Sequence, residues 1–332
     1  MRRFGRNISI AVATVIAVCA MICAALVWLS FADRALPVAT TAVTVDKGAS
    51  FAEVTDLLRR RGVIRSARLF RLFVRAERPD LSVEAAEYNF PAHETMGEVV
   101  AALAAGGRPV VVWLTVPEGF TARQIAHRLE DAGVFPAADF LHVAFGTSIQ
   151  IDGVRTKNLE GYLFPDTYSI PRDASPASVA AMMTRQFVRE LPRDYRKAAQ
   201  RLRFSVPQIV TIASLIEREA KVDRERPLMA GVYYNRLRRG MPLQVDATIE
   251  YALPQHKSAL SYGDLAIDSP YNTYVHAGLP PTPIANPGKA SLDAAFHPRK
   301  TDFLYYVYMG DGRHKFSKTL EEQQRAERLY LH

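Results

Sequence analysis

Two glutamates, Glu217 and Glu219, stand near the end of an apolar stretch at residues 205–220. A carboxyl group that first donates a proton and then takes one back can break a glycosidic bond. It acts as an acid near neutral pH only if its pKa is raised, and burial among large apolar side chains raises it. The alternative is an acid-rich last helical turn, in which the two glutamates only pair with Arg218 and Arg224.

The stretch that carries the glutamates is predicted to be a helix. Ser205 and Gln208 have the spacing of a capping box, and Pro207 falls in the first turn, where a missing N–H group has no cost. Apolar residues then recur at helical spacing: Ile209, Ile212, Ala213, Ile216 and Ala220. One face of this central helix is therefore expected to lie in the core.

Helical geometry alone does not choose between the two glutamates. At about 100° per residue, each lies roughly 80° from the centre of the apolar face, on opposite flanks. The flank of Glu219 carries the larger apolar side chains, those of Ile212, Leu215 and Ile216. The neighbours therefore favour Glu219 over Glu217 as the carboxyl group with the raised pKa.

The composition is that of a globular protein, with 48% hydrophobic and 23% charged residues in a chain of 332. Such a length predicts about two domains. The net charge of +8 suits an anionic partner, such as membrane headgroups, a cell-wall polymer or nucleic acid, without choosing among them.

Residues 8–31 contain no charged side chain and are long enough to cross a bilayer as a helix. Arg2, Arg3 and Arg6 precede them, so the positive-inside rule predicts a cytoplasmic N-terminus and an exported remainder. A cleaved signal peptide is the alternative, but its apolar region is usually about 7–15 residues long. Residues 1–33 are thus predicted to form the cytoplasmic N-terminus and transmembrane anchor of a single-pass protein of the cell inner membrane, with the bulk of the chain in the periplasm.

The predicted export excludes several kinds of catalytic and binding site from the rest of the chain. Cys19 and Cys23 both lie in the predicted anchor, so the exported part has neither disulfides nor cysteine chemistry. Nucleic acid is not expected as a partner of an exported chain. The sequence has no serine-hydrolase elbow and no phosphate-binding glycine loop, and His276, His297 and His314 lack metal-ligand spacing. No metal and no cofactor are expected.

An internal repeat follows the anchor. The stretch T-V-D-K-G at 44–48 returns as T-V-P-E-G at 115–119, and this offset of 71 holds without gaps for about 30 residues. Further on, Y-N-F-P at 88–91 matches Y-L-F-P at 162–165, at an offset of 74. The change of offset predicts a short insertion between the two matches.

The repeat predicts a duplicated small α+β module, with one copy at 42–112 and a second, with its connection, at 113–200. Both copies have a capping box and a glycine stop around the first helix: Ser50 with Glu53 and Gly62, and Thr121 with Gln124 and Gly133. Chance similarity of short amphipathic helices is the alternative.

Residues 201–332 are richer in polar motifs beside prolines and are predicted to form a mixed α+β domain around the central helix. Its other expected elements are a helix at 227–239, a strand at 303–308 paired with 313–317, and a last helix at 320–331. Residues 243–248 alternate in polarity and are predicted to be a short strand.

Two polar groups in this domain are candidates for substrate binding. On the predicted short strand three side chains would share one side and could bind hydroxyl and acetamide groups, and a following turn adds two tyrosines and an amide. The six candidates are Gln244, Asp246, Thr248, Tyr271, Asn272 and Tyr274. A solvated strand face is the alternative. If the substrate is a glycan, the usual pair of carboxylates would be Glu219 or Glu217 with Asp246 or Asp268.

Several motifs, in their number and order, are similar to those of one known family. They are A-S-L-I-E-R-E at 213–219, N-R-L at 235–237, the stretch 243–248, Y-N-T-Y at 271–274, G-L-P-P at 278–281, N-P-G at 286–288 and L-E-G-Y-L-F-P-D-T-Y at 159–168. On these residues the chain resembles the YceG-like family of endolytic murein transglycosylases over nearly its whole length. It departs mildly at Val245 and Ala247, which are expected to face away from the site.

The resemblance implies a site and a role. The second acid of the family's signature helix is catalytic, which carries over to Glu219. The family also implies a LysM-like module after the anchor. It implies cleavage of the MurNAc–GlcNAc bond within nascent peptidoglycan strands, with 1,6-anhydroMurNAc ends as products. The family is thought to end strand elongation beside the peptidoglycan synthases. The alternatives are a non-catalytic peptidoglycan-binding or synthase-scaffold protein, and a hydrolytic muramidase.

Overall fold

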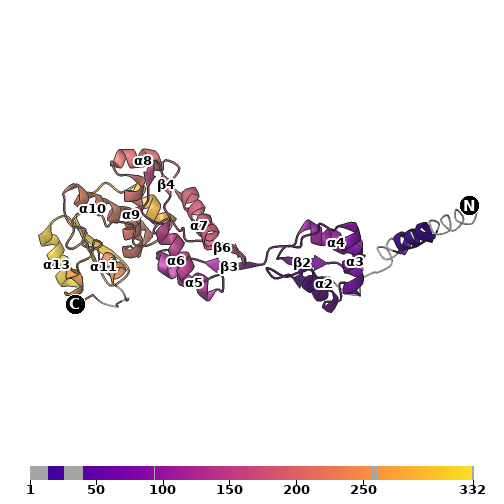
Figure 1. The fold of residues 1–332 in the computed structure, drawn as a ribbon. Helices are drawn as coiled ribbons and strands as arrows, with labels where there is room; N and C mark the ends of the chain where they lie inside the picture. Colours follow the sequence, from indigo (N-terminus) through magenta and orange to yellow (C-terminus); the bar gives the residue numbers. More distant parts are fainter. Residues whose placement is uncertain are drawn as a thin grey trace, which may run out of the picture. The chain divides into compact units, whose positions relative to one another are not determined.

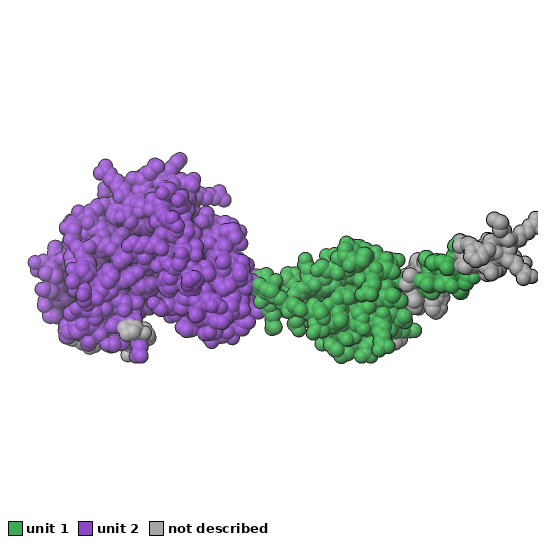
Figure 2. Space-filling view, viewed as in Figure 1, with its two compact units in different colours: residues 1–111, 171–173 green, residues 112–170, 174–332 purple. Residues whose placement is uncertain are grey.

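The structure is a computed structural model that describes residues 14–25, 40–92, 94–253, 255, 257 and 260–330. Figure 1 shows its helices and strands. The chain divides into two compact units, coloured separately in Figure 2. Unit 1 comprises residues 1–111 with 171–173, and unit 2 comprises 112–170 with 174–332. The predicted second module and the predicted catalytic domain thus lie together in unit 2.

Residues 14–25 are helical, and their large apolar side chains, such as that of Met21, are exposed. No helix among the described residues is long and apolar enough to span a membrane. The remaining residues of the predicted span 8–31 lie outside the described ranges. The anchor therefore stays a prediction.

The first copy of the repeat forms a small α+β module in unit 1. Its elements are β1 (Thr41–Thr44), α2 (Phe51–Arg60), α3 (Ala67–Glu77), β2 (Glu87–Phe90) and α4 (Met96–Ala105). The two strands pair antiparallel, with Val43 opposite Tyr88. Both side chains are buried with Leu58 and Phe70 in a core between the strands and the helices.

The second copy has the same order of elements. They are β3 (Val111–Thr115), α5 (Ala122–Asp131), α6 (Ala137–Gly146), β6 (Thr167–Pro171) and α7 (Pro176–Glu190), and β3 lies beside β6. Helices α2 and α5 begin with the two predicted capping boxes. The glycines that follow them, Gly62 and Gly133, have φ angles of +77° and +68°, which suit glycine. Both segments therefore begin with a strand, a turn and a capped helix.

The predicted offset of 74 for the later match is wrong. Strand β6 is the counterpart of β2, so Tyr88 corresponds to Tyr168, an offset of 80, and both tyrosines are buried. The insertion in the second copy includes the hairpin β4 (Gln150–Ile151) and β5 (Val154–Arg155) and then residues 159–165. The Y-L-F-P match at 162–165 misled because those residues belong to the insertion and not to the repeat.

The rest of unit 2 surrounds the central helix, α9 (Val206–Glu219), which packs against α8, α10, α11 and α12. The surrounding elements are α8 (Tyr195–Leu202), α10 (Arg226–Arg238), α11 (Asp246–Ala252), α12 (Lys289–Phe296), β7 (Tyr305–Tyr308), β8 (His314–Ser317) and α13 (Leu320–Tyr330), with 3₁₀ turns at Asp223–Glu225 and Asp264–Ala266. The capping box of α9 and the β7–β8 hairpin are as predicted.

Helix α9 is buried on more sides than its predicted single apolar face. Val210, Thr211 and Ser214 are buried as well as the isoleucines. The Ser214 hydroxyl donates to the Thr211 carbonyl oxygen at 2.7 Å and accepts from the Ile284 N–H at 3.1 Å. These bonds satisfy a polar side chain in the core, so the proline-rich loop, residues 278–288, can cover the second face of α9.

The predicted strand at 243–248 is wrong. Gln244 has a φ angle of +52°, and α11 begins at Asp246. Val245 and Thr248 are buried whereas Gln244 and Asp246 are exposed. Burial does alternate from Leu243 to Ala247, but the backbone turns at Gln244 and is helical from Asp246, so this alternation did not mark a strand.

Candidate active site

Glu219 is the last residue of α9 and lines a cleft of about 490 Å³ in unit 2. The cleft is formed by α9, α10, the segment before α11, the hairpin β7–β8 and α13. Its polar lining includes Arg236, Gln244, Asp246, Tyr274 and Tyr306. With the turn that carries Tyr274, six separate parts of the chain therefore line one cleft with the half-buried carboxyl group of Glu219.

The surroundings of Glu219 raise its pKa to about 7. Burial is the largest cause, since a carboxylate loses its hydration there, and the negative charge of Asp246 adds to it. The hydroxyl of Tyr306 donates to Glu219 Oε2 at 3.2 Å and, with the Ala247 N–H, partly offsets this rise. Near neutral pH the group is thus populated in both the acid and the base form.

Glu217, the other candidate, points into a different environment. Its Oε1 accepts from Arg226 Nη1 at 3.2 Å and its Oε2 from the Gly288 N–H at 2.9 Å. Only 6% of its side chain is exposed. Both oxygens are engaged in a buried ion pair and a backbone contact, so Glu217 tethers α9 to the start of α12 and does not line the cleft.

Tyr306 holds the carboxyl group of Glu219 in place. Its hydroxyl lies 2.9 Å from that of Tyr233 on α10, so the two tyrosines and Glu219 form a chain of hydrogen bonds. Burial raises the pKa of both tyrosine hydroxyls, which therefore stay protonated. The sequence indicates Tyr306 only as part of a buried strand, because nothing local links it to a helix 87 residues earlier.

Arg236 is a second residue that the sequence analysis missed as a site residue, although its N-R-L motif was noted. Its buried guanidinium donates to the carbonyl oxygens of Leu304 at 2.6 Å, Pro242 at 3.1 Å and Leu243 at 2.9 Å, and to Gln244 Oε1 at 3.3 Å. Arg236 thereby joins the segment before α11 to the start of the hairpin and shapes one wall of the cleft.

Three of the six predicted substrate-binding residues lie with Glu219. Gln244, Asp246 and Tyr274 all line the cleft, and the Tyr274 hydroxyl donates to Asp246 Oδ1. Asp268, the other candidate for a second carboxylate, is exposed in a turn and does not line this cleft. Of these two candidates for a second carboxylate, Asp246 alone lines the cleft with Glu219.

The other three candidates are engaged within the fold. Thr248 Oγ1 donates to the Val245 carbonyl oxygen at 2.7 Å. Asn272 is fully buried, and its Nδ2 donates to two backbone carbonyl oxygens at 3.0 and 2.9 Å. The Tyr271 hydroxyl lies 2.8 Å from Thr282 Oγ1. These residues support the segments that carry Asp246 and Tyr274, and their contact with substrate stays a prediction.

A further buried carboxyl group, Glu160, lies outside the cleft. Its Oε1 accepts from the Ala122 N–H at 2.9 Å and from Asn286 Nδ2 at 3.1 Å, and its Oε2 accepts from the Tyr251 hydroxyl at 3.1 Å. Burial raises the pKa of Glu160 to about 7 against the effect of these bonds. The residue joins α5, the proline-rich loop and α11. Its place in the L-E-G-Y motif was the only signal in the sequence.

Within the part of the chain that the structure describes, no three His, Cys, Asp or Glu side chains are grouped so that they could hold a metal ion. The chemistry that the cleft offers comes from Glu219, Asp246, the tyrosine hydroxyls and Arg236.

Comparison with known proteins points to one family. The model of the YceG-like family matches residues 43–328. The endolytic murein transglycosylase of Bacillus subtilis (strain 168) is 34% identical over 309 residues, which cover 88% of this chain and 85% of the relative. That of Streptococcus pneumoniae serotype 2 is 28% identical over 315 residues, 85% of this chain but only 57% of the longer relative.

A solved structure is similar as well. The crystal structure of a yceG-like protein from Listeria monocytogenes matches with a TM-score of 0.57 and 33% sequence identity. The match covers 86% of this chain and 98% of the Listeria chain.

Proposed function

The chain belongs to the YceG-like family, and on this premise we propose that it is an endolytic lytic transglycosylase of peptidoglycan. It would cleave the bond between N-acetylmuramic acid and N-acetylglucosamine inside a glycan strand. The observation that carries the proposal is the half-buried carboxyl group of Glu219, with a pKa of about 7, in a polar cleft.

One carboxyl group suffices for both proton transfers of this reaction. Protonated Glu219 gives its proton to the glycosidic oxygen as the bond from that oxygen to muramyl C1 breaks. The C6 hydroxyl oxygen of the same muramyl residue then bonds to C1, and its proton passes to the Glu219 carboxylate. The products are a free 4-hydroxyl end and a 1,6-anhydro end, and no water is consumed.

The neighbours of Glu219 fit this cycle. Tyr306 donates to Oε2 and so orients the carboxyl group within the cleft. Asp246 lies close enough for its negative charge to raise the pKa of Glu219. The same charge would stabilise the positive charge that develops at C1.

Asp246 also favours one rival function. A muramidase needs a second carboxylate to act as a nucleophile or to activate water, and Asp246 lines the same cleft as Glu219. Its hydrogen bond from Tyr274 suits an electrostatic role better, because the bond occupies one carboxylate oxygen. A hydrolase would leave reducing muramic ends, whereas a transglycosylase leaves ends that borohydride does not reduce.

The test is Glu219→Gln, which keeps the size of the side chain but removes the titrating proton. We expect cleavage of purified glycan strands to fall by roughly 10²–10⁴-fold, the usual contribution of general acid–base catalysis. Mass analysis of the new ends of parent digests should show 1,6-anhydro residues, lighter by one water than reducing ends.

The matched control is Glu217→Gln, two residues earlier in the same helix and outside the cleft. Folded protein of this variant should lose much less activity than Glu219→Gln. Strands cut equally well by Glu219→Gln and the parent would favour the non-catalytic scaffold, and reducing ends from the first time point would favour the muramidase.

The proposal extends to the place of action. The uncharged segment 8–31 behind three arginines supports a single-pass anchor in the inner membrane with the catalytic unit outside the cytoplasm. The duplicated modules would act as LysM-like contacts to glycan. Such an enzyme beside the peptidoglycan synthases would terminate the elongation of nascent strands.

A further inference from the structure

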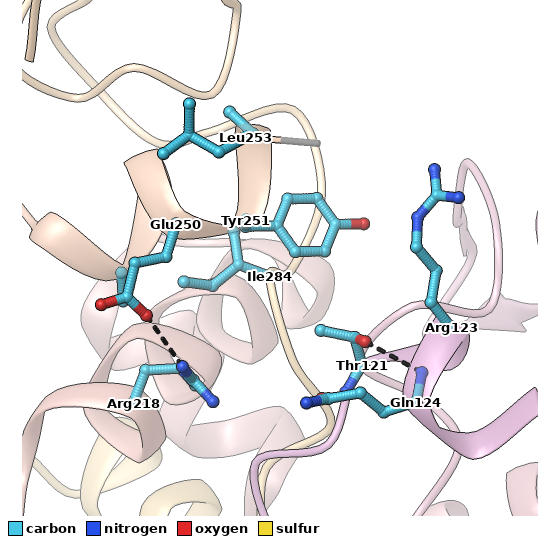
Figure 3. Close-up of a pocket in the computed structure, with 10 residues that line it drawn as sticks. Thr121, Arg123, Gln124, Arg218, Glu250, Tyr251, Leu253 and Ile284 are labelled. Carbon is cyan, nitrogen blue, oxygen red and sulfur yellow. Dashed lines mark hydrogen bonds and ion pairs between the residues drawn. The ribbon is translucent and has the colours of Figure 1, made fainter. Parts of the chain in front are cut away.

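A second cavity, of about 590 Å³, lies in unit 2 next to the elements of the catalytic cleft. Figure 3 shows its lining: the start of α5 with Thr121, Arg123 and Gln124 on one side, and α11 with Glu250 and Tyr251 on the other. Arg218, from the last turn of α9, closes it below. No function described above uses this cavity.

The cavity and the cleft share their framework. Helix α9 carries Glu219 into the cleft and Arg218 into the cavity, and α11 carries Asp246 into the cleft and Glu250 into the cavity. The negative charge of Glu250 acts on Glu219, so the two sites lie within electrostatic range of each other. A branched substrate bound at Glu219 could therefore extend a branch into the cavity.

Of the two arginines that line the cavity, one has an ion-pair partner and the other has none among the described residues. Arg218 Nη2 lies 3.0 Å from Glu250 Oε2, so these two residues balance each other. Arg123 forms no ion pair with any residue in the described ranges, and its guanidinium lies over the ring of Phe145, 5.4 Å from the ring centre. In Figure 3 Arg123 stands across the cavity from Tyr251.

The other polar groups on the wall are already satisfied. Thr121 and Gln124 bind each other's backbone N–H groups in the capping box of α5. The Tyr251 hydroxyl donates to the buried Glu160. Arg123, at the positive end of the α5 dipole, is thus the lining cation that has no ion pair among the described residues. Its charge acts on the buried Glu160, whose carboxyl oxygens are already hydrogen-bonded within the fold. Neutral sugar hydroxyls do not require such a charge, whereas a carboxylate does, and a guanidinium binds a carboxylate with two parallel hydrogen bonds.

We propose that this cavity binds a carboxylate of the peptide that branches from the muramyl residue, with Arg123 as the group that recognises it. The proposal rests on the proposed function, because only a murein strand carries such a peptide beside the scissile bond. It makes the enzyme selective for strands that still carry their peptides.

The test compares two substrates with the full-length protein: uncrosslinked glycan strands with their peptides, and the same strands after an amidase has removed the peptides. We expect the parent to have a higher kcat/KM for the peptide-bearing strands. Arg123→Gln should reduce this preference by roughly 3- to 30-fold, the range for a hydrogen-bonded charge contact. The matched control is Arg185→Gln, an exposed arginine on α7 that lines no part of the cavity, which should keep the parent's preference.

A binding measurement separates this proposal from the proposed function. In a Glu219→Gln background, which cannot turn the substrate over, the added Arg123→Gln change should weaken binding of peptide-bearing strands by a similar factor. A parent that prefers neither substrate, or a preference that survives Arg123→Gln, would overturn the carboxylate site. Failure of the parent to cut either kind of strand would instead overturn the proposed function.

Discussion

Glu219 and Asp246 show how two nearby carboxyl groups acquire different roles. Glu219 is packed at the end of α9, and burial followed by the charge of Asp246 raises its pKa to about 7. Asp246 is exposed in the cleft and bonded by Tyr274. The first group can exchange a proton near neutral pH, and the second supplies a fixed negative charge.

This division of roles predicts a pH effect for Asp246→Asn. Removing the negative charge should lower the pKa of Glu219, so the proton that the acid must donate is lost at lower pH. The alkaline limb of the profile of kcat/KM against pH should therefore move down, by on the order of half to one pH unit. The control is Asp268→Asn, since that carboxylate is exposed and outside the cleft. An Asp246→Asn profile that overlays the parent's would exclude the charge of Asp246 as a cause of the raised pKa.

At the scale of elements, the insertion in the second module connects that module to the central helix. The side-chain oxygen of Asn286, in the proline-rich loop, accepts from the N–H groups of Gly161 at 2.9 Å and Leu163 at 2.8 Å. The same loop bonds to α9 through Ser214. The inserted residues 159–165 thus hold the loop that covers one side of the catalytic helix.

Gly161→Ala should break this junction. Gly161 has a φ angle of +89°, and an added Cβ would lie 2.4 Å from two carbon atoms of Pro283. Gly153 has a similar φ of +78° with open space around it. Gly153→Ala therefore measures only the loss of stability from placing a side chain in a left-handed backbone conformation, about 1–2 kcal/mol. We expect the free energy of unfolding to fall by a further 1–3 kcal/mol in Gly161→Ala, measured by denaturant titration. Equal losses in the two variants would mean that the loop yields to the extra methyl group.

The buried Glu160 predicts a pH dependence of stability. Its pKa is raised from 4.5 to about 7 in the folded chain, so the folded state binds the proton more tightly than the unfolded one. This contribution to stability is fully present below about pH 4.5 and is lost as the pH rises through about 7. In Glu160→Gln the loss of stability between pH 5 and 8 should be smaller by on the order of 1–3 kcal/mol.

Thermal unfolding of the two proteins at pH 5 and pH 8 checks this expectation. Part of the slope should remain in the variant, because Glu219 titrates in the same range with the same sign. The control is Glu321→Gln on the surface of α13, whose pKa is lowered by the backbone N–H groups at the helix start and by Thr319, so it does not titrate above pH 5. A Glu160→Gln variant with the full slope of the parent would show that Glu160 is not the group responsible.

At the scale of the whole molecule, the sequence begins with three arginines, continues with an uncharged segment and then has a globular composition. The structure divides into two compact units. The proposed cell-wall substrate lies outside the cytoplasm, so the catalytic unit must be exported. Arg2, Arg3 and Arg6 before the uncharged segment 8–31 are the features of the sequence that would set this orientation.

A reporter fused to the C-terminus tests the orientation. We expect an alkaline phosphatase fusion, which is active only after export, to be active, and a fluorescent protein that matures only in the cytoplasm to stay dark. The matched control is the same pair of fusions on a chain that lacks residues 1–33, where the pattern should reverse. Fluorescence from the complete chain would refute the anchor and with it the proposed place of action.

The sequence by itself determined the features that depend on near neighbours. The capping boxes of α2, α5 and α9 involve residues three apart, and the repeat shows them twice. The hairpin of β7 and β8 joins adjacent segments. Local patterns failed at 243–248, because buried and exposed side chains alternate there although the backbone turns at Gln244 and enters α11. They also failed at 162–165, where residues similar to those at 88–91 belong to an insertion and not to the repeat.

The neighbouring residues and the family resemblance favoured Glu219, but only the tertiary structure showed why Glu219 lines the cleft and Glu217 does not. The helical wheel put Glu217 and Glu219 on equivalent flanks, and each flank is defined by partners distant in the chain. Gly288, 71 residues away, binds Glu217, and Tyr306, 87 residues away, binds Glu219. The same holds for Arg236, whose guanidinium reaches a carbonyl oxygen 68 residues away. A carboxyl group owes its pKa to whatever the folded chain packs around it, and a window of neighbouring residues contains only part of that information.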